Sequence, residues 1–145
     1  LNDPLFGAPF AFTEIVRDHW GKQLAWPWQS LLASWERIGP WPWSHYAVTV
    51  GLAEFVAGAA LLIGALLAVR FLRLSYAIYV LGMAGLVLST SFLLSTPRYL
   101  LTIFPLFMLL GLLVRYPTLF KSILLVEAVV LGFLTSTYVR GWWAF

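Results

Sequence analysis

The sequence predicts an all-α membrane protein with about four antiparallel transmembrane helices, preceded by an outward-facing, tryptophan-rich segment of short amphipathic helices. Of the 145 residues, 61% are hydrophobic and only 10% are charged, whereas soluble domains usually carry about 25% charged residues. The mean hydropathy is +0.88. After residue 44 the chain consists largely of apolar stretches close to the length of about 20 residues that crosses a bilayer.

The first 44 residues differ from the rest in composition, because they hold four of the six acidic residues and six of the eight tryptophans. Helical spacing of apolar residues predicts one short helix in PFAFTEIVRDHW and a second in WQSLLASWERIG. Leu31, Leu32, Trp35 and Ile38 are expected to share one apolar face of the second helix. Tryptophan favours the headgroup region of a membrane. Residues 1–44 therefore form either an extracytoplasmic segment lying on the membrane surface or a small soluble cap packed on the spans.

Residues 45–145 are predicted to form the transmembrane bundle. Its four spans are expected over about residues 46–69, 74–94, 99–114 and 119–139. The connections VRFLR, STPR and VRYPTLFK are short, so consecutive spans should be antiparallel neighbours. Pro105 lies in the middle of the third span and is expected to kink it. The motif RGWW after the fourth span is typical of an aromatic anchor at the membrane interface.

The charges of the short connections predict the orientation in the membrane. Arg70 and Arg73 follow the first span, and Arg115 and Lys121 follow the third. Basic residues in short loops favour the cytoplasmic side. The tryptophan-rich segment, the STPR turn and the C-terminus then face the opposite side. We expect a multi-pass protein of a bacterial plasma membrane, or of the endoplasmic reticulum membrane in a eukaryote.

Several classes of function are disfavoured by the sequence. The nine lysines and arginines are scattered singly, which argues against nucleic acid as a partner. The absence of cysteine removes disulfides and thiolate metal sites. His19 and His45 have no neighbours at metal-ligand spacing, so the sequence supports no divalent metal. It contains no HExxH, GxSxG or glycine-rich phosphate loop, and therefore no self-contained active site of a soluble type.

Two carboxylates fall within the predicted spans. A charged group in a membrane costs several kcal/mol unless it is paired or hydrated, so each carboxylate is a candidate functional residue. Glu54 has two interpretations: a role toward a substrate, or a hydrogen bond or ion pair with a group such as Arg98 or His45. Glu127 lies six residues from Lys121. The alternative to a functional role is a structural one, in which the side chain of Glu127 extends toward that cation.

The stretch STPRYLLTIFP places a cation at the start of the third span. Pro97 is favourable in a first helical turn, and Ser95 or Thr96 can cap that turn. Arg98 should therefore lie at the outer headgroup level beside Tyr99. There it can bind a lipid phosphate, helped by the backbone N–H groups of the helix start. The alternative is a guanidinium that only extends toward ordinary lipid headgroups.

Two stretches resemble PIG-V-type mannosyltransferases and their bacterial relatives, which are polytopic glycosyltransferases of the GT-C class. STPRYLLTIFPLF resembles their late transmembrane region. LNDPLFGAPFAFTEIVRDHWGKQLAWPW resembles an outward segment with Asp-Pro, Trp-Gly-Lys and Pro-Trp motifs, and the C-terminal RGWW is similar as well. The matching positions of the outward segment are Asp3, Pro4, Trp20, Gly21, Lys22, Pro27 and Trp28.

The resemblance implies an enzyme that transfers a mannosyl or other hexosyl group from a polyprenyl- or dolichyl-phosphate sugar to an acceptor on the non-cytoplasmic face. It implies that Arg98 and Tyr99 contact the phosphate of this lipid-linked donor, and that Asp3, Trp20 and Lys22 lie on the acceptor side. No cofactor is expected.

The chain begins at Leu1 without a signal peptide, so we expect a C-terminal fragment. Its partners would be the bilayer and the remaining N-terminal spans, which would supply the catalytic acidic residue. The alternative function is a small non-enzymatic membrane protein, such as a scaffold, an assembly factor or a transporter subunit.

Overall fold

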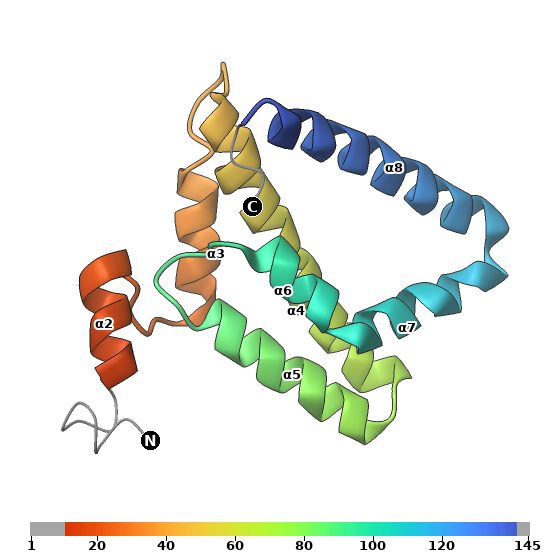
Figure 1. Ribbon diagram of the computed structural model, residues 1–145. Helices are drawn as coiled ribbons and strands as arrows, with labels where there is room; N and C mark the ends of the chain where they lie inside the picture. The colour runs from red at the N-terminus through yellow and green to blue at the C-terminus, as the bar shows by residue number, and fades with distance from the viewer. Residues whose placement is uncertain (1–10, 142–145) are drawn as a thin grey trace.

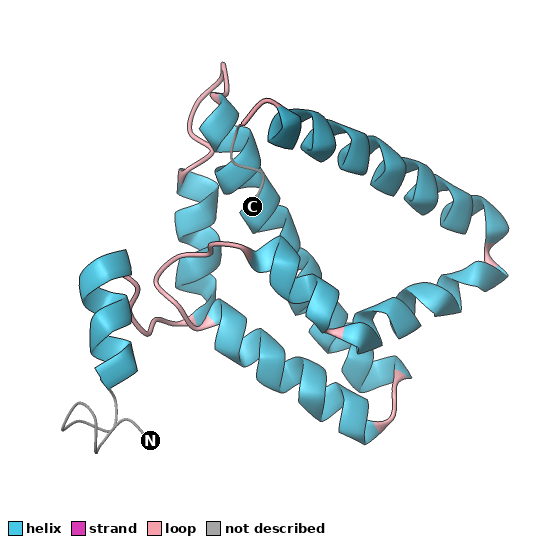
Figure 2. Ribbon diagram, in the orientation of Figure 1, coloured by secondary structure: helices cyan, strands magenta, loops and turns pink. Residues whose placement is uncertain are grey.

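The computed structural model describes residues 11–141, and within this range the chain is built from helices and loops without any named strand (Figures 1 and 2). The all-α prediction is therefore confirmed. In chain order the elements are α2 (Ala11–Trp20), α3 (Pro27–Glu36), the π-helix η1 (Ala47–Leu52), α4 (Ala53–Phe71), α5 (Leu74–Leu88), α6 (Thr96–Thr102), α7 (Phe104–Leu112), the 3-10 helix η2 (Leu113–Arg115) and α8 (Pro117–Val139).

Two helices are long and apolar enough to cross a membrane. One is the continuous unit of η1 and α4, with 25 residues, and the other is α8, with 23 residues. The bent pair formed by α6 and the α7–η2 unit makes a third if it counts as one span. α5 has 15 residues, which is about 22 Å of helix against a hydrocarbon core of about 30 Å. The structure thus has two helices, or three counting the bent pair, that could cross a membrane, and the predicted four spans are not confirmed.

α5 ends at Leu88, six residues before the predicted end of the second span. The following residues are serine and threonine, which bond to nearby backbone groups and compete with helix formation. Thr90 donates its hydroxyl proton to the carbonyl oxygens of Val87 and Phe92, at 3.3 and 2.9 Å. The backbone N–H of Ser91 donates to the carbonyl of Gln23 at 2.8 Å. The chain therefore leaves the helix to pair with a segment far away in the sequence.

The predicted kink in the third span is present. α6 and the α7–η2 unit are bent by 76° relative to each other, and the break lies at Ile103, whose φ and ψ are −91° and 72°. Pro105 occupies the first turn of α7. It has no N–H to donate, and its ring would collide with the preceding helical turn, so α6 stops before it and α7 begins anew.

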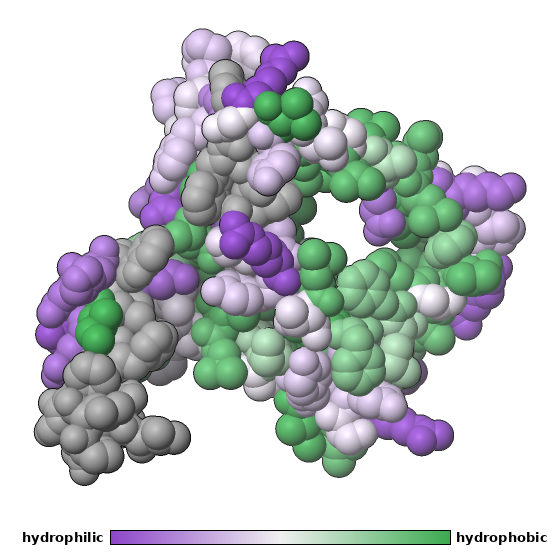
Figure 3. Space-filling model, viewed as in Figure 1, coloured by the Kyte–Doolittle hydropathy of each residue, from purple (hydrophilic) through white to green (hydrophobic). Residues whose placement is uncertain are grey.

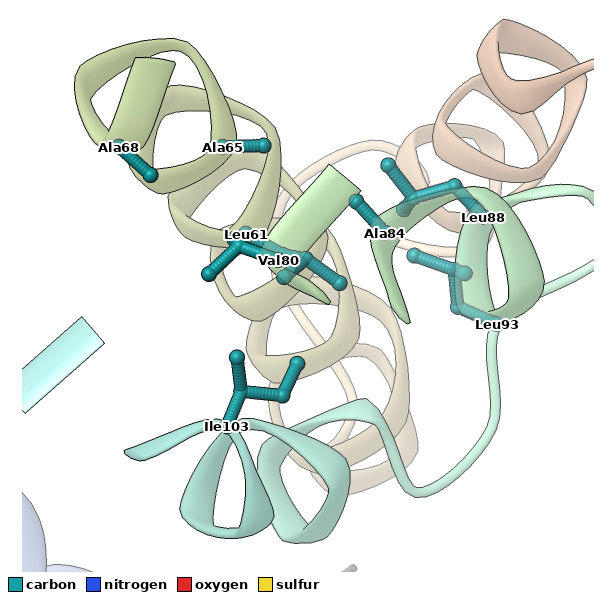
Figure 4. Packing of buried hydrophobic residues seen from close by; sticks show 8 residues of the cluster. All are labelled: Leu61, Ala65, Ala68, Val80, Ala84, Leu88, Leu93 and Ile103. Carbon is teal, nitrogen blue, oxygen red and sulfur yellow. The ribbon is translucent and has the colours of Figure 1, made fainter. Parts of the chain in front are cut away.

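The core lies where α4, α5 and the α6–α7 break meet (Figure 4). It consists of Leu61, Ala65, Ala68, Val80, Ala84, Leu88, Leu93 and Ile103. Glycines on α4 permit the close approach: a Cβ at Gly58 would lie 2.5 Å from a Leu93 methyl carbon, and one at Gly64 would lie 2.5 Å from a Leu106 methyl carbon. Small residues at such contacts are the usual packing device of membrane helices.

α3 packs on η1, α4 and α5, and its predicted apolar face is only partly turned toward them, with Leu31 packed against the core. Ile38, just after the helix, is 7% exposed, whereas Leu32 and Trp35 are 55% and 58% exposed. The buried positions within α3 are Ser30 and Ser34. Their small side chains let α3 approach closely, and the Ser30 hydroxyl donates to the Leu88 carbonyl at 2.8 Å. The aromatic side chains of α3 consequently point outward.

α8 does not join a compact antiparallel bundle, which corrects the predicted up-and-down arrangement. It runs from η2 as a separate arm (Figure 1), and Figure 3 shows an opening between this arm and the other helices. None of its most apolar 18-residue stretch is buried; only near its C-terminal end is a residue, Thr137, buried. Because apolar residues occur all around α8, no single face favours packing onto the other helices.

Candidate functional site

The site is built on the loop between α5 and α6, residues 89–95, which packs against the connection between α2 and α3. Three hydrogen bonds join the two segments. The N–H of Ser91 donates to the Gln23 carbonyl at 2.8 Å, and the N–H of Gln23 donates to the Ser91 hydroxyl at 3.2 Å. The N–H of Ala25 donates to the Ser89 carbonyl at 3.3 Å. These bonds bring together parts of the chain that are almost 70 residues apart.

Glu54 fixes the far end of the same loop. Its side chain is 1% exposed, and its two carboxylate oxygens accept the backbone N–H groups of Ser95 at 2.5 Å and of Thr96 at 2.9 Å. Ser95 has a φ of 65° and its own side chain makes no capping bond. Glu54 therefore caps α6 from a neighbouring helix, and the bonds from two N–H groups stabilise its buried charge.

This finding changes two predictions about the start of the third span. The predicted side-chain cap from Ser95 or Thr96 is replaced by the carboxylate of Glu54. The N–H groups of Ser95 and Thr96, which were expected to assist a lipid phosphate, already donate to that carboxylate. The structural interpretation of Glu54 expected a hydrogen bond or an ion pair. Glu54 does form hydrogen bonds, to the backbone N–H groups of Ser95 and Thr96.

Lys22 and Arg37 converge on the ring of Phe92. The Lys22 Nζ lies 5.6 Å from the ring centroid and the Arg37 Cζ lies 4.6 Å from it, both within the range of a cation–π contact. Arg37 also donates from Nη1 to the Leu93 carbonyl at 3.2 Å. Neither cation forms an ion pair with another residue in the range 11–141.

The surroundings of Lys22 disfavour its protonated, charged form. Its pKa is lowered from the ordinary value of 10.5, chiefly because burial disfavours the charged form. The carboxylate of Glu54 acts in the opposite sense, and the nearby charge of Arg37 lowers the pKa further. The two cations thus share the ring of Phe92, and the buried carboxylate of Glu54 influences the charge of Lys22.

The other predicted site residues fall in different places. Arg98 lies in the first turn of α6 with an exposed side chain, next to the exposed Tyr99. Trp20 is the last residue of α2, and Asp3 lies outside the described residues. Of these candidates, the structure brings Lys22 to the α5–α6 loop, which leads directly into the turn that carries Arg98.

Glu127 is exposed on α8, far along the chain from the loop. Within the described part of the chain it forms no ion pair with Lys121. No three histidine, cysteine, aspartate or glutamate side chains among residues 11–141 are grouped so as to hold a metal ion.

Sequence reasoning missed Arg37 and Phe92, which complete the cluster around Lys22. The comparisons give no further guide, because no protein-family model, no curated protein and no solved structure matches this chain. The resemblance to PIG-V-type enzymes accordingly stays a prediction that rests on its own motifs.

Proposed function

We propose that this chain is the C-terminal membrane region of a glycosyltransferase of the GT-C class, by resemblance a mannosyltransferase. It would take a hexose from a polyprenyl- or dolichyl-phosphate sugar and transfer it to an acceptor on the non-cytoplasmic face. One observation carries the proposal. The two stretches that resemble this family lie next to each other in space, because the segment around Gln23 is hydrogen-bonded to the loop that leads into STPR.

Arg98 and Tyr99 are the proposed contacts to the donor phosphate. Arg98 follows a loop whose end is held by Glu54, so the backbone beneath the guanidinium is fixed before a ligand arrives. A planar guanidinium with several N–H groups suits a phosphate, which accepts from two of them at once. Lys22, together with Trp20 and Asp3, belongs to the acceptor side in this proposal. The catalytic carboxylate would come from another outer loop of the enzyme.

The proposed topology keeps the loops with Arg70, Arg73, Arg115 and Lys121 in the cytoplasm, in a bacterial plasma membrane or the endoplasmic reticulum. The outward aromatic face of α3 supports a membrane position for this segment. Buried serines and exposed tryptophans are the reverse of a soluble amphipathic helix, whereas lipid is a suitable environment for exposed aromatic rings.

The phosphate role is tested by replacing Arg98. The full encoded protein in nanodiscs is titrated with polyprenyl-phosphate mannose, and binding is followed by native mass spectrometry. Arg98→Ala should weaken binding about tenfold, because a charge-assisted hydrogen bond is lost. Arg98→Lys should retain part of the affinity, because lysine keeps the positive charge but lacks the planar set of donors.

Arg140→Ala is the control, because Arg140 follows α8 and is expected at the same membrane face. Equal affinity of the Arg98→Ala variant and the unchanged protein would remove Arg98 from the site. A full-length protein that binds no lipid-linked sugar at all would instead be the non-enzymatic membrane protein of the alternative interpretation.

A further inference from the structure

We infer that Lys22 and Arg37, placed around the ring of Phe92, form a binding site for a phosphate group. The site is separate from the proposed donor contact at Arg98. It depends only on the contacts of the α5–α6 loop, so it does not require that the protein be a glycosyltransferase.

The geometry gives the site its donors. Lys22 precedes α3, Arg37 follows it, and Phe92 comes from the loop packed beside it. Because each cationic group lies within 5.6 Å of one ring centroid, the two lie within about twice that distance of each other. Arg37 uses one N–H for the Leu93 carbonyl, which leaves four of its five donors, and the ammonium of Lys22 has three. Because Lys22 has a flexible four-carbon side chain, its ammonium can turn toward Arg37 so that both groups donate to one tetrahedral phosphate.

The charges favour an anion between these side chains. The carboxylate of Glu54 offsets part of their positive charge, since it raises the pKa of Lys22, but its oxygens already accept the N–H groups of Ser95 and Thr96. In the part of the chain that the structure describes, neither Lys22 nor Arg37 has an ion-pair partner. Burial and mutual repulsion both disfavour the charge on Lys22. A bound anion would offset both effects, since an opposite charge favours the protonated form.

The surroundings identify phosphate as the suitable anion. Leu24 and Trp26, which lie two and four residues after Lys22, are strongly exposed. The rings of Trp26 and Trp28 stack with their centroids 5.1 Å apart. Exposed tryptophans of this kind are typical of the headgroup depth of a bilayer, where phosphate groups are the abundant anions. The group can belong to a lipid headgroup or to a soluble ligand, since the two share the same chemistry.

The chain offers a direct measurement, because Lys22 and Lys121 are its only lysines. The 145-residue chain is labelled with ¹³C-lysine and placed in maltoside detergent micelles, which contain no phosphate. One arm adds inorganic phosphate, and the other adds phosphatidylglycerol to the micelles. The ε-methylene resonance of Lys22 should shift in a saturable manner in at least one arm, while that of the exposed Lys121 should not. Saturation with inorganic phosphate identifies a soluble ligand, and a response to phosphatidylglycerol alone identifies a headgroup.

Variants separate a binding site from general surface charge. Arg37→Gln should weaken the phosphate response of Lys22 about tenfold, and Arg37→Lys should restore most of it. Arg70→Gln is the matched control, because Arg70 also lies over a phenylalanine, 5.4 Å from the ring centroid of Phe71, but does not contact the ring of Phe92. This variant should change the affinity less than about twofold.

The site would be refuted if Lys22 and Lys121 shifted alike without saturation in both arms. It would also be refuted if Arg37→Gln bound as the unchanged protein does, or if Arg70→Gln caused an equal loss. Arg98 and the sugar donor play no part in these measurements, so failure here leaves the proposed donor contact untouched, and failure of donor binding leaves this site untouched.

Discussion

Glu54 caps α6 by accepting the backbone N–H of Thr96 at 2.9 Å, across 42 positions of sequence. With the bond from the neighbouring Ser95, this contact turns a buried carboxylate of α4 into the anchor of a loop. The same loop carries Phe92 toward Lys22 and Arg37, and it leads into Arg98. Glu54 thus helps to fix the loop on which the candidate site is built.

Removing the carboxylate should therefore destabilise the protein. Glu54→Ala should lower the free energy of unfolding by about 3 kcal/mol, since two buried N–H groups lose a charged acceptor, and Glu54→Gln should cost less because one oxygen remains. Thermal unfolding in detergent micelles measures the effect. Glu127→Ala is the control, because this glutamate is exposed on α8. Equal losses for the two alanine variants would show that Glu54 does not anchor the loop.

Replacing a glycine with alanine should have opposite effects on stability in α4 and in α8. A Cβ at Gly58 would lie 2.5 Å from a Leu93 methyl carbon and 2.8 Å from one of Leu31, so Gly58→Ala should destabilise by about 1 kcal/mol as the contacts are forced apart. Gly132 has no such neighbour within 4 Å. Gly132→Ala should stabilise by about 0.5 to 1 kcal/mol through helix propensity. Equal shifts in the unfolding temperature would contradict the close packing at Gly58.

The titration of Lys22 should report its surroundings. Its pKa is lowered from 10.5, mainly by burial, so the folded state releases this proton before the unfolded state does. Stability should therefore rise as the pH increases from the lowered pKa of Lys22 to 10.5. Arg37→Gln should raise the pKa of Lys22, because it removes a neighbouring positive charge. Lysine ¹³C resonances followed against pH test this, and an unchanged Lys22 titration in the variant would rule out the coupling.

The outward face of α3 should contact lipid. The chain has no cysteine, so a spin label can be attached at Leu32→Cys without a background. We expect this label to collide more often with oxygen than with a water-soluble nickel chelate, because oxygen concentrates in lipid. A label at Glu36→Cys, near the end of the helix, is the control and should be reached by the chelate. Chelate access to the Leu32 position equal to that at Glu36 would place this face in water.

The sequence was informative where a local signal decides the structure. Long apolar runs predicted the helices around Leu61 and Val126, Gly21 marked the end of α2 with a φ of 62°, and Pro105 predicted the bend of the third span. Each depends on residues close together in the chain. Span number was less predictable, since it depends on where α5 stops, and α5 stops where its backbone pairs with the segment around Gln23.

The candidate site could not be predicted for the same reason. The partners of Glu54 are backbone N–H groups, which every residue except proline has and no motif reveals. Phe92 and the two cations meet across more than 50 residues of intervening chain. The apolar face of α3 did not reveal all the residues that pack inward, because in a membrane small residues such as Ser30 and Ser34 can pack inward as well.

The most direct test of the proposed function measures the turnover of a lipid-linked sugar. Membranes from cells that lack the gene, and from the same cells with the full gene restored, receive polyprenyl-phosphate carrying radiolabelled mannose. The account predicts that only the restored membranes move the label from the donor to an acceptor, and that Arg98→Ala reduces this transfer. Intact donor in both membranes, with the full-length protein present and folded, would contradict it.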